Sequence, residues 1–268
     1  MPELDTLEDT LFVPMLGRIY ASENFPNILK DGKALELRDR LPGNIKGKDT
    51  QTQYTLLAGA VRSANMDRRI RDFLARRRDG VVVLFGCGLE TTPQRNEDME
   101  TEWYCLDLPD VIEYRRTLLP EGENERYIPG DAFDLGWLDV VRSEYPDAPI
   151  LVVVSGVFHY FPREKVVGLL RDMTDHGDIE VVFDAFSSSA LKRVHRYMKQ
   201  VGHEDARMHF CVDDAAGFVA EVGGASELVL DEKYYSRVDR KGMGLSTRVT
   251  MWGADLMSMI KTIQISLQ

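Results

Sequence analysis

The chain has 268 residues, of which 44% are hydrophobic, with a formal net charge of −11 and a pI near 5.0. This length allows one large domain with its own core and an appendage, and is short for two full domains. The acidic balance disfavours a protein that binds nucleic acid through its phosphates, so small molecules or proteins are the expected partners.

Cysteine usage and the first residues indicate the compartment. Cys87, Cys105 and Cys211 form no CxxC pair and are an odd number for a disulfide framework, which predicts a reducing, cytoplasmic setting. The acidic start MPELDTLEDT lacks the order of a signal peptide, and no apolar stretch approaches the roughly eighteen residues of a membrane span, so no membrane association is expected. The five histidines are dispersed, without HExxH or paired Cys and His, so no metal site is expected.

Residues 1–78 are expected to form an N-terminal helical cap that could close over a substrate. Residues 54–78 carry apolar side chains at helical spacing, namely Leu57, Val61, Ile70, Phe73 and Leu74. A proline and two glycines within 42–47 predict a loop that divides the cap. The basic clusters at 68–71 and 76–78 are interpreted as a solvated helix face.

A glycine turn follows the first predicted strand. The β-branched, apolar run VVVLF empties into Gly86, Cys87 and Gly88, and glycine reaches positive φ and admits the close approach of another molecule. A second apolar run ends at Asp107, about twenty residues later, where nucleotide sites place an acid that accepts hydrogen bonds from a ribose. A helix directly after the turn would point its free N–H groups into the same crevice. The pattern favours a nucleotide-type cofactor, with a plain turn as the alternative.

The third glycine of the dinucleotide fingerprint distinguishes between cofactors. Its position is occupied here by Thr91. In a dinucleotide site that glycine lets the helix pack closely on the strand beneath the pyrophosphate, so its absence argues against NAD and FAD. S-adenosylmethionine has no phosphate and needs only an open turn, an acid for the ribose and a flat slot for adenine, which this sequence provides.

Strand and helix patterns alternate from residue 81 onward. Strands are expected at 81–86, 102–107, 126–129, 150–155 and 179–184, and helices at 109–119, 135–144 and 162–175. Short apolar strands separated by amphipathic helices predict a doubly wound α/β fold with a parallel sheet covered on both faces.

The end of the chain follows a different pattern. Strands are expected near 227–237 and 246–252, joined by too few residues for a helix, so they should form an antiparallel hairpin. A parallel sheet finished by a reversed last strand is the layout of the seven-stranded, Rossmann-like class I methyltransferases. That places the S-adenosylmethionine-binding domain at 79–253. The tail at 254–268 shows an amphipathic helical stripe that could pack on the domain or on a second subunit, which leaves a homodimer open.

Four segments carry a resemblance to a known family. They are GCGLETTPQR at 86–95, WYCLDLPDVIEYRRTLL at 103–119, GDAFDLGWLD at 130–139 and SGVFHYF at 155–161. Together they resemble the leucine carboxyl methyltransferase family, and within it the bacterial polyketide-tailoring (tetracenomycin-type) O-methyltransferases more than the phosphatase-modifying enzymes. The resemblance covers roughly residues 16–252, and it implies an S-adenosylmethionine-dependent O-methyltransferase that releases S-adenosylhomocysteine.

The resemblance also implies a set of cofactor-binding residues at strand ends and on one helix. These are Arg62, Gly86, Cys87, Gly88, Asp107, Leu108, Asp131, Ala132, Ser155 and Gly156. Arg62 would hold the methionyl carboxylate with its guanidinium fork, Asp107 the ribose hydroxyls and Asp131 the adenine amino group. The alternatives are Arg62 as a helix surface charge and Asp131 as a helix cap.

Two positions depart from the family pattern. Ser155 stands where the family commonly has an acid, so a contact to the cofactor ammonium is in doubt, and Glu90 replaces the family's aspartate after the glycine turn. These departures leave a non-catalytic cofactor-binding or partner protein as one alternative.

Methyl transfer from a sulfonium is an in-line displacement, so the protein mainly aligns the reacting atoms and excludes water. A carboxylate acceptor needs only positioning, whereas a hydroxyl benefits from a base. His159 is the candidate base or orienter, and Tyr160 the second candidate, with a pocket-wall role as its alternative. The acceptor pocket is expected between the N-terminal helices and residues 186–212, where the side chains suited to an aromatic ligand are Met198, His203, Met208, His209 and Phe210.

The expected acceptor is a hydroxyl or carboxylate of a small polyketide-like or aromatic natural product. A carboxyl methyltransferase acting on a protein or peptide C-terminus is the alternative, and it would need a pocket mouth open to a chain.

Overall fold

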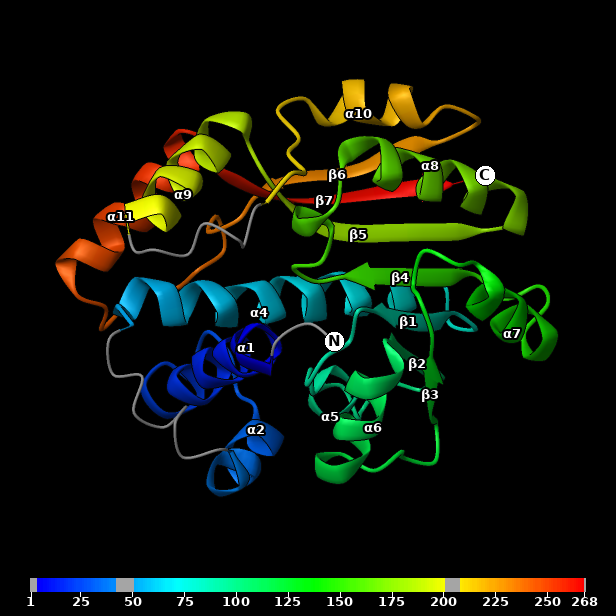
Figure 1. Ribbon diagram of the computed structural model, residues 1–268, viewed down its shortest axis with the longest axis horizontal. Coiled ribbons are helices and arrows are strands. Elements are labelled where there is room, and N and C mark those ends of the chain that lie inside the picture. The colour runs from blue at the N-terminus through cyan, green and yellow to red at the C-terminus, as the bar shows by residue number, and fades with distance from the viewer. Residues whose placement is uncertain (1–3, 42–50, 201–207, 268) are drawn as a thin grey trace.

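The computed structural model describes residues 4–41, 51–200 and 208–267. Its centre is a seven-stranded sheet in the order β3-β2-β1-β4-β5-β7-β6 (Figure 1). The strands are β1 Val81–Phe85, β2 Trp103–Asp107, β3 Glu125–Pro129, β4 Ile150–Val154, β5 Ile179–Phe186, β6 Glu227–Lys233 and β7 Ile260–Leu267. Strands β1 to β5 are parallel, and β7 is antiparallel to both β5 and β6. The predicted class I methyltransferase fold is confirmed.

The central strands are buried on both faces, which explains their continuous apolar runs. Alternate residues of β1 and β4 enter two separate hydrophobic clusters. One face packs against α7 (Gly136–Glu144), α8 (Arg163–Met173) and α10 (Ala215–Val222), and the other against α4 (Gln53–Arg76) and α6 (Pro109–Leu118). Each fully buried Val, Leu or Ile side chain contributes roughly 1.5–3 kcal/mol to this core.

The N-terminal region is helical, with α1 (Leu4–Asn24), α2 (Gly32–Leu37) and the short 3-10 helix η1 (Arg38–Arg40) preceding α4. All five apolar residues that predicted α4 are buried, and α1 lies alongside α4 (Figure 1). Thr52 caps α4, because its hydroxyl accepts the backbone N–H of Thr55. The loop predicted at 42–47 lies outside the described residues.

The basic clusters of α4 are not simply a solvated face. Arg69 is buried, and Arg76 forms two hydrogen bonds of 3.0 Å to the buried carboxylate of Glu180 in β5. The prediction is wrong at Arg69, because α4 packs on the sheet on one side and on α1 on the other. Arg76 is exposed as predicted, although its guanidinium also pairs with Glu180.

The second strand of the predicted hairpin is not observed as a strand. Residues 246–252 belong to helix α11 (Leu245–Leu256), whose buried positions Thr247, Met251 and Ala254 have helical spacing. Its exposed face also carries apolar residues, namely Leu245, Val249, Trp252 and Leu256. Because apolar side chains lie on both faces of the helix, the sequence shows no clear helical period. The β-branched residues of this segment favoured the prediction of a strand.

The predicted helical tail is wrong as well, because residues 260–267 form β7. This strand inserts between β5 and β6 and pairs with β5 from Phe186↔Ile260 to Ile179↔Leu267 (Figure 1). Both faces of β7 are buried, so apolar residues occur on both. Their spacing happens to agree with that of an amphipathic helix, which explains the wrong prediction. β6 ends at Lys233, so Tyr234 and Tyr235, which were expected within that strand, lie beyond it and are buried.

The remaining elements are short or connect the strands. They are α5 (Thr92–Arg95), η2 (Phe158–Tyr160), η3 (Thr174–His176) and α9 (Ser188–Gln200). None of the helices in the described part of the chain is long and apolar enough to cross a membrane.

Candidate active site

The glycine turn has the open geometry that the sequence predicts. Gly86 has φ 67° and Gly88 has φ 47°, both in the left-handed region that glycine tolerates. A Cβ at Gly86 would lie 2.6 Å from a methyl carbon of Val157, so a larger residue does not fit. The helix after the turn is the single-turn α5, not a long helix with its N-terminus at the crevice. The turn therefore lacks the phosphate-binding helix end of a dinucleotide site.

Asp107 stands at the end of β2 and is held by the turn. One carboxylate oxygen accepts the N–H of Gly88 at 2.7 Å, and the other accepts the N–H of Leu108 at 2.8 Å. Burial raises the pKa of Asp107. A carboxylate offers about four acceptor positions, so about two stay available for a pair of hydroxyls. Leu108 follows with 49% of its surface exposed, which gives an apolar platform beside the acid.

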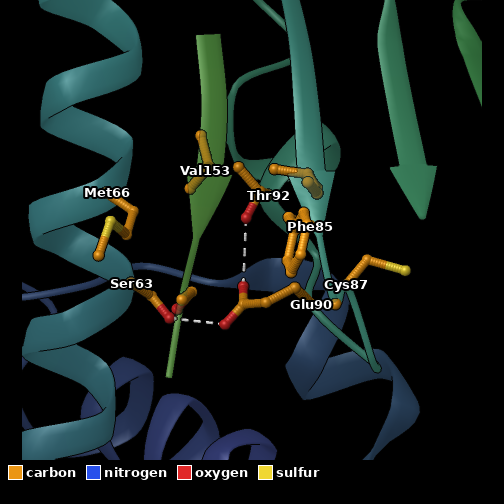
Figure 2. Close-up of a pocket in the computed structure, with 10 residues that line it drawn as sticks. Ser63, Met66, Phe85, Cys87, Glu90, Thr92 and Val153 are labelled. Atoms are coloured by element: carbon orange, nitrogen blue, oxygen red, sulfur yellow. Dashed lines mark hydrogen bonds between the residues drawn. The ribbon is translucent and has the colours of Figure 1, made fainter. Parts of the chain in front are cut away.

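A narrow pocket opens behind the turn, where α4, β1 and β4 meet (Figure 2). It is lined by Ser63, Met66, Leu84, Phe85, Gly86, Cys87, Glu90, Thr92, Val153 and Ser155. β1 and β4 are the neighbouring strands at which the strand order reverses. Open α/β sheets bind ligands at this point, outside the carboxyl ends of the strands.

Glu90 is one of the two positions that depart from the family pattern, and both of its carboxylate oxygens accept hydrogen bonds. Figure 2 shows its carboxylate between the hydroxyls of Ser63 and Thr92, at 2.8 and 3.2 Å. Arg18 of α1 and Arg95 of α5 donate to it at 2.8 and 3.0 Å. Burial alone would raise the pKa of Glu90, but the two guanidinium groups hold it well below its usual range. The charged carboxylate thus ties the N-terminal helices to the glycine turn.

Arg115 explains part of the LDLPDVIEYRR segment and was not singled out from the sequence. It is fully buried and donates to the backbone carbonyls of Gly88 at 3.1 Å and Glu90 at 2.6 Å, while pairing with Glu125 at 3.1 Å. Its guanidinium therefore stabilises the backbone of the glycine turn through these two hydrogen bonds. The sequence could have pointed to Arg115, because it is a charged residue on the apolar face of a predicted helix.

Arg62 within α4 meets Gly156, which follows β4, and Asp184 near the end of β5. The Nε of Arg62 lies 3.0 Å from Asp184 Oδ2, and the N–H of Gly156 donates to Asp184 Oδ1 at 2.7 Å. Gly156 has φ 72°, and a Cβ there would collide with Arg62 Nη1. Burial opposes both charges, yet Asp184 raises the pKa of Arg62, and Arg62 with His159 lowers the pKa of Asp184. Asp184 was not singled out from the sequence, although it and Glu180 are the two acids of the otherwise apolar strand IEVVFDAF.

His159 lies in η2, directly beside this group. Its Nε2 is 2.9 Å from Asp184 Oδ2, and its ring packs 4.6 Å from that of Phe186. It is only 1% exposed, and its Nδ1 has no hydrogen-bond partner among the described residues. Tyr160 is 42% exposed, and burial of its hydroxyl raises its pKa.

The residues expected at the adenine end lie after β3. Asp131 is exposed and accepts the N–H of Phe133 at 2.9 Å, and the carbonyl of Ala132 accepts the indole N–H of Trp137 at 3.1 Å. The alternative role of Asp131 as a helix cap is wrong, because α7 begins at Gly136 with Leu135 as its cap.

The segment at 186–212 is only partly as predicted. It begins with α9, but His203 and the side chain of Met198 lie outside the described residues. Phe210 is not a pocket residue, because it is fully buried in an aromatic core cluster with Phe158, Phe183 and Phe218. His209 is exposed, and its backbone N–H donates to the carbonyl of His159 at 2.6 Å.

Comparison with known proteins agrees with this geometry. The family model for leucine carboxyl methyltransferase matches residues 15–174. The tetracenomycin polyketide synthesis O-methyltransferase TcmP of Streptomyces glaucescens is 30% identical over 184 residues, which cover 68% of this chain and 67% of TcmP. The S-adenosyl-L-methionine-dependent methyltransferase dpfgK of Gibberella zeae is 26% identical over 183 residues, covering 63% of this chain and 61% of dpfgK.

A solved structure supports the fold. The magnesium protoporphyrin IX methyltransferase of Synechocystis PCC 6803, crystallised with S-adenosylhomocysteine, aligns with a TM-score of 0.52. The alignment covers 98% of this chain and all of the other, at 10% sequence identity, so the likeness concerns the fold alone.

Proposed function

The chain belongs to the leucine carboxyl methyltransferase family, and we propose that it transfers the methyl group of S-adenosylmethionine to an oxygen atom of a small natural product. The observation that carries this proposal is the 30% identity to a polyketide O-methyltransferase across two thirds of both chains. The acceptor expected from this relative is polyketide-like or aromatic.

The cofactor would lie across the ends of β1, β2 and β4. The two free acceptor positions of Asp107 suit the ribose hydroxyls, and the exposed face of Leu108 suits the adenine ring. Asp131 and Ala132 would meet the far edge of the base. Gly86, Cys87 and Gly88 would border the amino-acid moiety, where the two glycines, which lack a Cβ, allow the backbone to approach closely.

At the other end, Arg62 would bind the methionyl carboxylate. Its Nε faces Asp184, while 24% of its side-chain surface stays exposed. Ser155 and Gly156 would lie near the cofactor ammonium, with a hydroxyl and backbone groups in place of the family's acid. These assignments use residues that the fold already brings to one edge of the sheet.

The cofactor supplies an electrophilic methyl group. The chain's own residues would align the acceptor oxygen with that group and exclude water, which accounts for most of the catalysis in such a displacement. A hydroxyl acceptor must also lose its proton as the new oxygen–methyl bond forms, and we assign Nδ1 of His159 as the group that orients the hydroxyl and accepts that proton, with Tyr160 on the pocket wall. A carboxylate acceptor would need neither.

A methyl-transfer screen tests this function. The protein is incubated with S-adenosylmethionine labelled in its methyl group and a panel of phenols, aromatic acids and a peptide with a free C-terminal carboxylate. We expect labelled product from a small aromatic compound. A methyl ester releases its label in base, whereas a methyl ether does not, so base treatment identifies the oxygen that was methylated.

The other outcomes identify the alternatives. Label on the peptide alone would favour the carboxyl methyltransferase of protein C-termini, to which the family description points. Binding of S-adenosylmethionine with no transfer to any acceptor would favour the non-catalytic alternative. The variant E180Q serves as a control for the screen. It removes a buried acid at the start of β5, away from the carboxyl end of the strand, and should leave methyl transfer unchanged.

A further inference from the structure

We propose that Asp184 is a positioning residue that fixes the guanidinium of Arg62 and the imidazole of His159 at the same time. This role deepens the proposed function and rests on it, since it requires Arg62 as a cofactor-binding residue. Asp184 itself need not touch the cofactor or the acceptor, because its oxygens are directed at protein groups.

Asp184 is a buried acid whose charge is fully paired. The residue is 1% exposed near the end of β5, where an unpaired carboxylate would be costly. Three groups offset that cost: the N–H of Gly156 at 2.7 Å, His159 Nε2 at 2.9 Å and Arg62 Nε at 3.0 Å. They come from three different elements, so the carboxylate joins η2, α4 and the end of β4.

Arg62 and Asp184 form a close ion pair, in which Nε lies 3.0 Å from Asp184 Oδ2 without the geometry of a hydrogen bond. The Nε side of the guanidinium faces Asp184, and its Nη1 side packs against the Cα of Gly156, where a Cβ would collide. A planar guanidinium fixed at one edge presents its remaining N–H groups in a set direction, as bidentate recognition of a carboxylate requires. The orientation of the proposed cofactor ligand therefore depends on Asp184.

The same carboxylate selects the tautomer of His159. An ionised carboxylate only accepts hydrogen bonds, so Nε2 must carry the proton. In the neutral ring, Nδ1 then holds the lone pair, and it is buried without a partner among the described residues. A buried acceptor with no protein partner is an atom that a ligand hydroxyl or a bound water would satisfy. Asp184 thus prepares His159 to accept a proton or hydrogen bond through Nδ1.

Glu180 provides the comparison that separates positioning from plain packing. It lies four residues earlier on β5, is buried, and pairs with Arg76 of the same helix that carries Arg62. Both acids therefore connect β5 to α4 through an arginine. If Asp184 served only to hold the helix on the sheet, D184N and E180Q would have similar effects.

Calorimetric titration with S-adenosylmethionine is the test. We expect D184N to weaken binding roughly tenfold or more, because the buried charge partner of Arg62 is lost. Arg62 loses its fixed direction, and the site gains positive charge against a cofactor with two cationic groups and one anionic group. E180Q should change the dissociation constant less than about twofold, even if it lowers thermal stability as much.

Double variants show whether Asp184 acts through Arg62. In the R62K background, D184N should cause little further loss of affinity, because the group that it orients is already changed. Equal losses from D184N in both backgrounds would overturn the proposal, as would equal losses from D184N and E180Q in the wild-type background.

Nitrogen-15 NMR of the histidine rings tests the second contact without any variant of Asp184. We expect His159, assigned by comparison with H159Q, to be protonated on Nε2 in the neutral form. Protonation on Nδ1, or an even mixture, would overturn this half of the proposal. A wild-type protein that fails to bind S-adenosylmethionine would instead refute the proposed function, and the NMR result would still be readable.

Discussion

At the residue scale, glycines with positive φ determine where the site can form. Gly86 and Gly88 open the turn, and Gly156 lets the Arg62 guanidinium approach the end of β4. The first two could be predicted from the sequence, because a Gly-x-Gly directly after an apolar strand, with an acid ending the next strand, is typical of a cofactor turn. The role of Gly156 could not, since the side chain that contacts it comes from a helix far away in the sequence.

Replacing Gly156 with alanine should damage both stability and cofactor binding. The strained φ should cost about 1–3 kcal/mol of folding free energy, and the new Cβ should displace Arg62 and weaken binding of S-adenosylmethionine. Thermal unfolding and calorimetry measure the two effects. The control is Gly168→Ala in α8, where a Cβ meets no atom within 4 Å and should be neutral or slightly stabilising. Equal behaviour of the two variants would contradict the packing described at Gly156.

Glu90 makes a prediction about acid stability. Its folded-state pKa is lowered, so the stability that it contributes is fully present above about pH 4.3, the ordinary glutamate pKa. That contribution is lost as the pH falls further, toward the lowered folded-state value. In E90Q the loss should be absent, so the stability gap between wild type and variant should shrink by more than about 1 kcal/mol between pH 7 and pH 3.

Denaturant unfolding at several pH values measures this gap. E113Q, at an exposed position of α6, is the control and should follow the wild type across the range. Parallel stability curves for wild type and E90Q would mean that the carboxylate does not depend on Arg18 and Arg95 as described.

At the element scale, the sequence predicted β1 to β5 well and the last third of the chain poorly. Strands buried on both faces between amphipathic helices leave strong patterns, and the predicted ranges agree with the observed strands to within a few residues. α11 and β7 were misassigned for opposite reasons. α11 exposes apolar residues on its outer face, and β7 buries polar residues such as Gln264, whose amide donates to Glu180 at 2.6 Å. In both cases tertiary packing overrides the local pattern.

The position of β7 can be checked by truncating one side chain. Ile265 is fully buried in the main core cluster, so Ile265→Ala should lower the free energy of unfolding by about 2–5 kcal/mol. Leu245, with 74% of its surface exposed on α11, is the control, and Leu245→Ala should change stability by about 0.5 kcal/mol or less. Chemical denaturation measures both. A mild effect at Ile265 would be incompatible with a buried strand paired on both sides by β5 and β6.

At the scale of the whole molecule, the site forms where the N-terminal helices meet the carboxyl edge of the parallel sheet. α4 contributes Arg62 and Ser63, the strand ends contribute the glycine turn, Asp107 and Asp184, and the Glu90 network connects the two parts. The cofactor class could be read from the sequence because its binding residues follow strands directly. The acceptor could not, because the pocket expected between the helical cap and residues 186–212 is marked by no sequence motif.

We expect S-adenosylmethionine to bind between Asp107 and Arg62, and a crystal structure of the complex with S-adenosylhomocysteine tests this placement most directly. The ribose hydroxyls should lie on the Asp107 carboxylate, the base against Leu108, and the ligand carboxylate on the Arg62 guanidinium, with Asp184 still behind it. Ligand density at another place, or no density at saturating concentration, would contradict this placement of the cofactor.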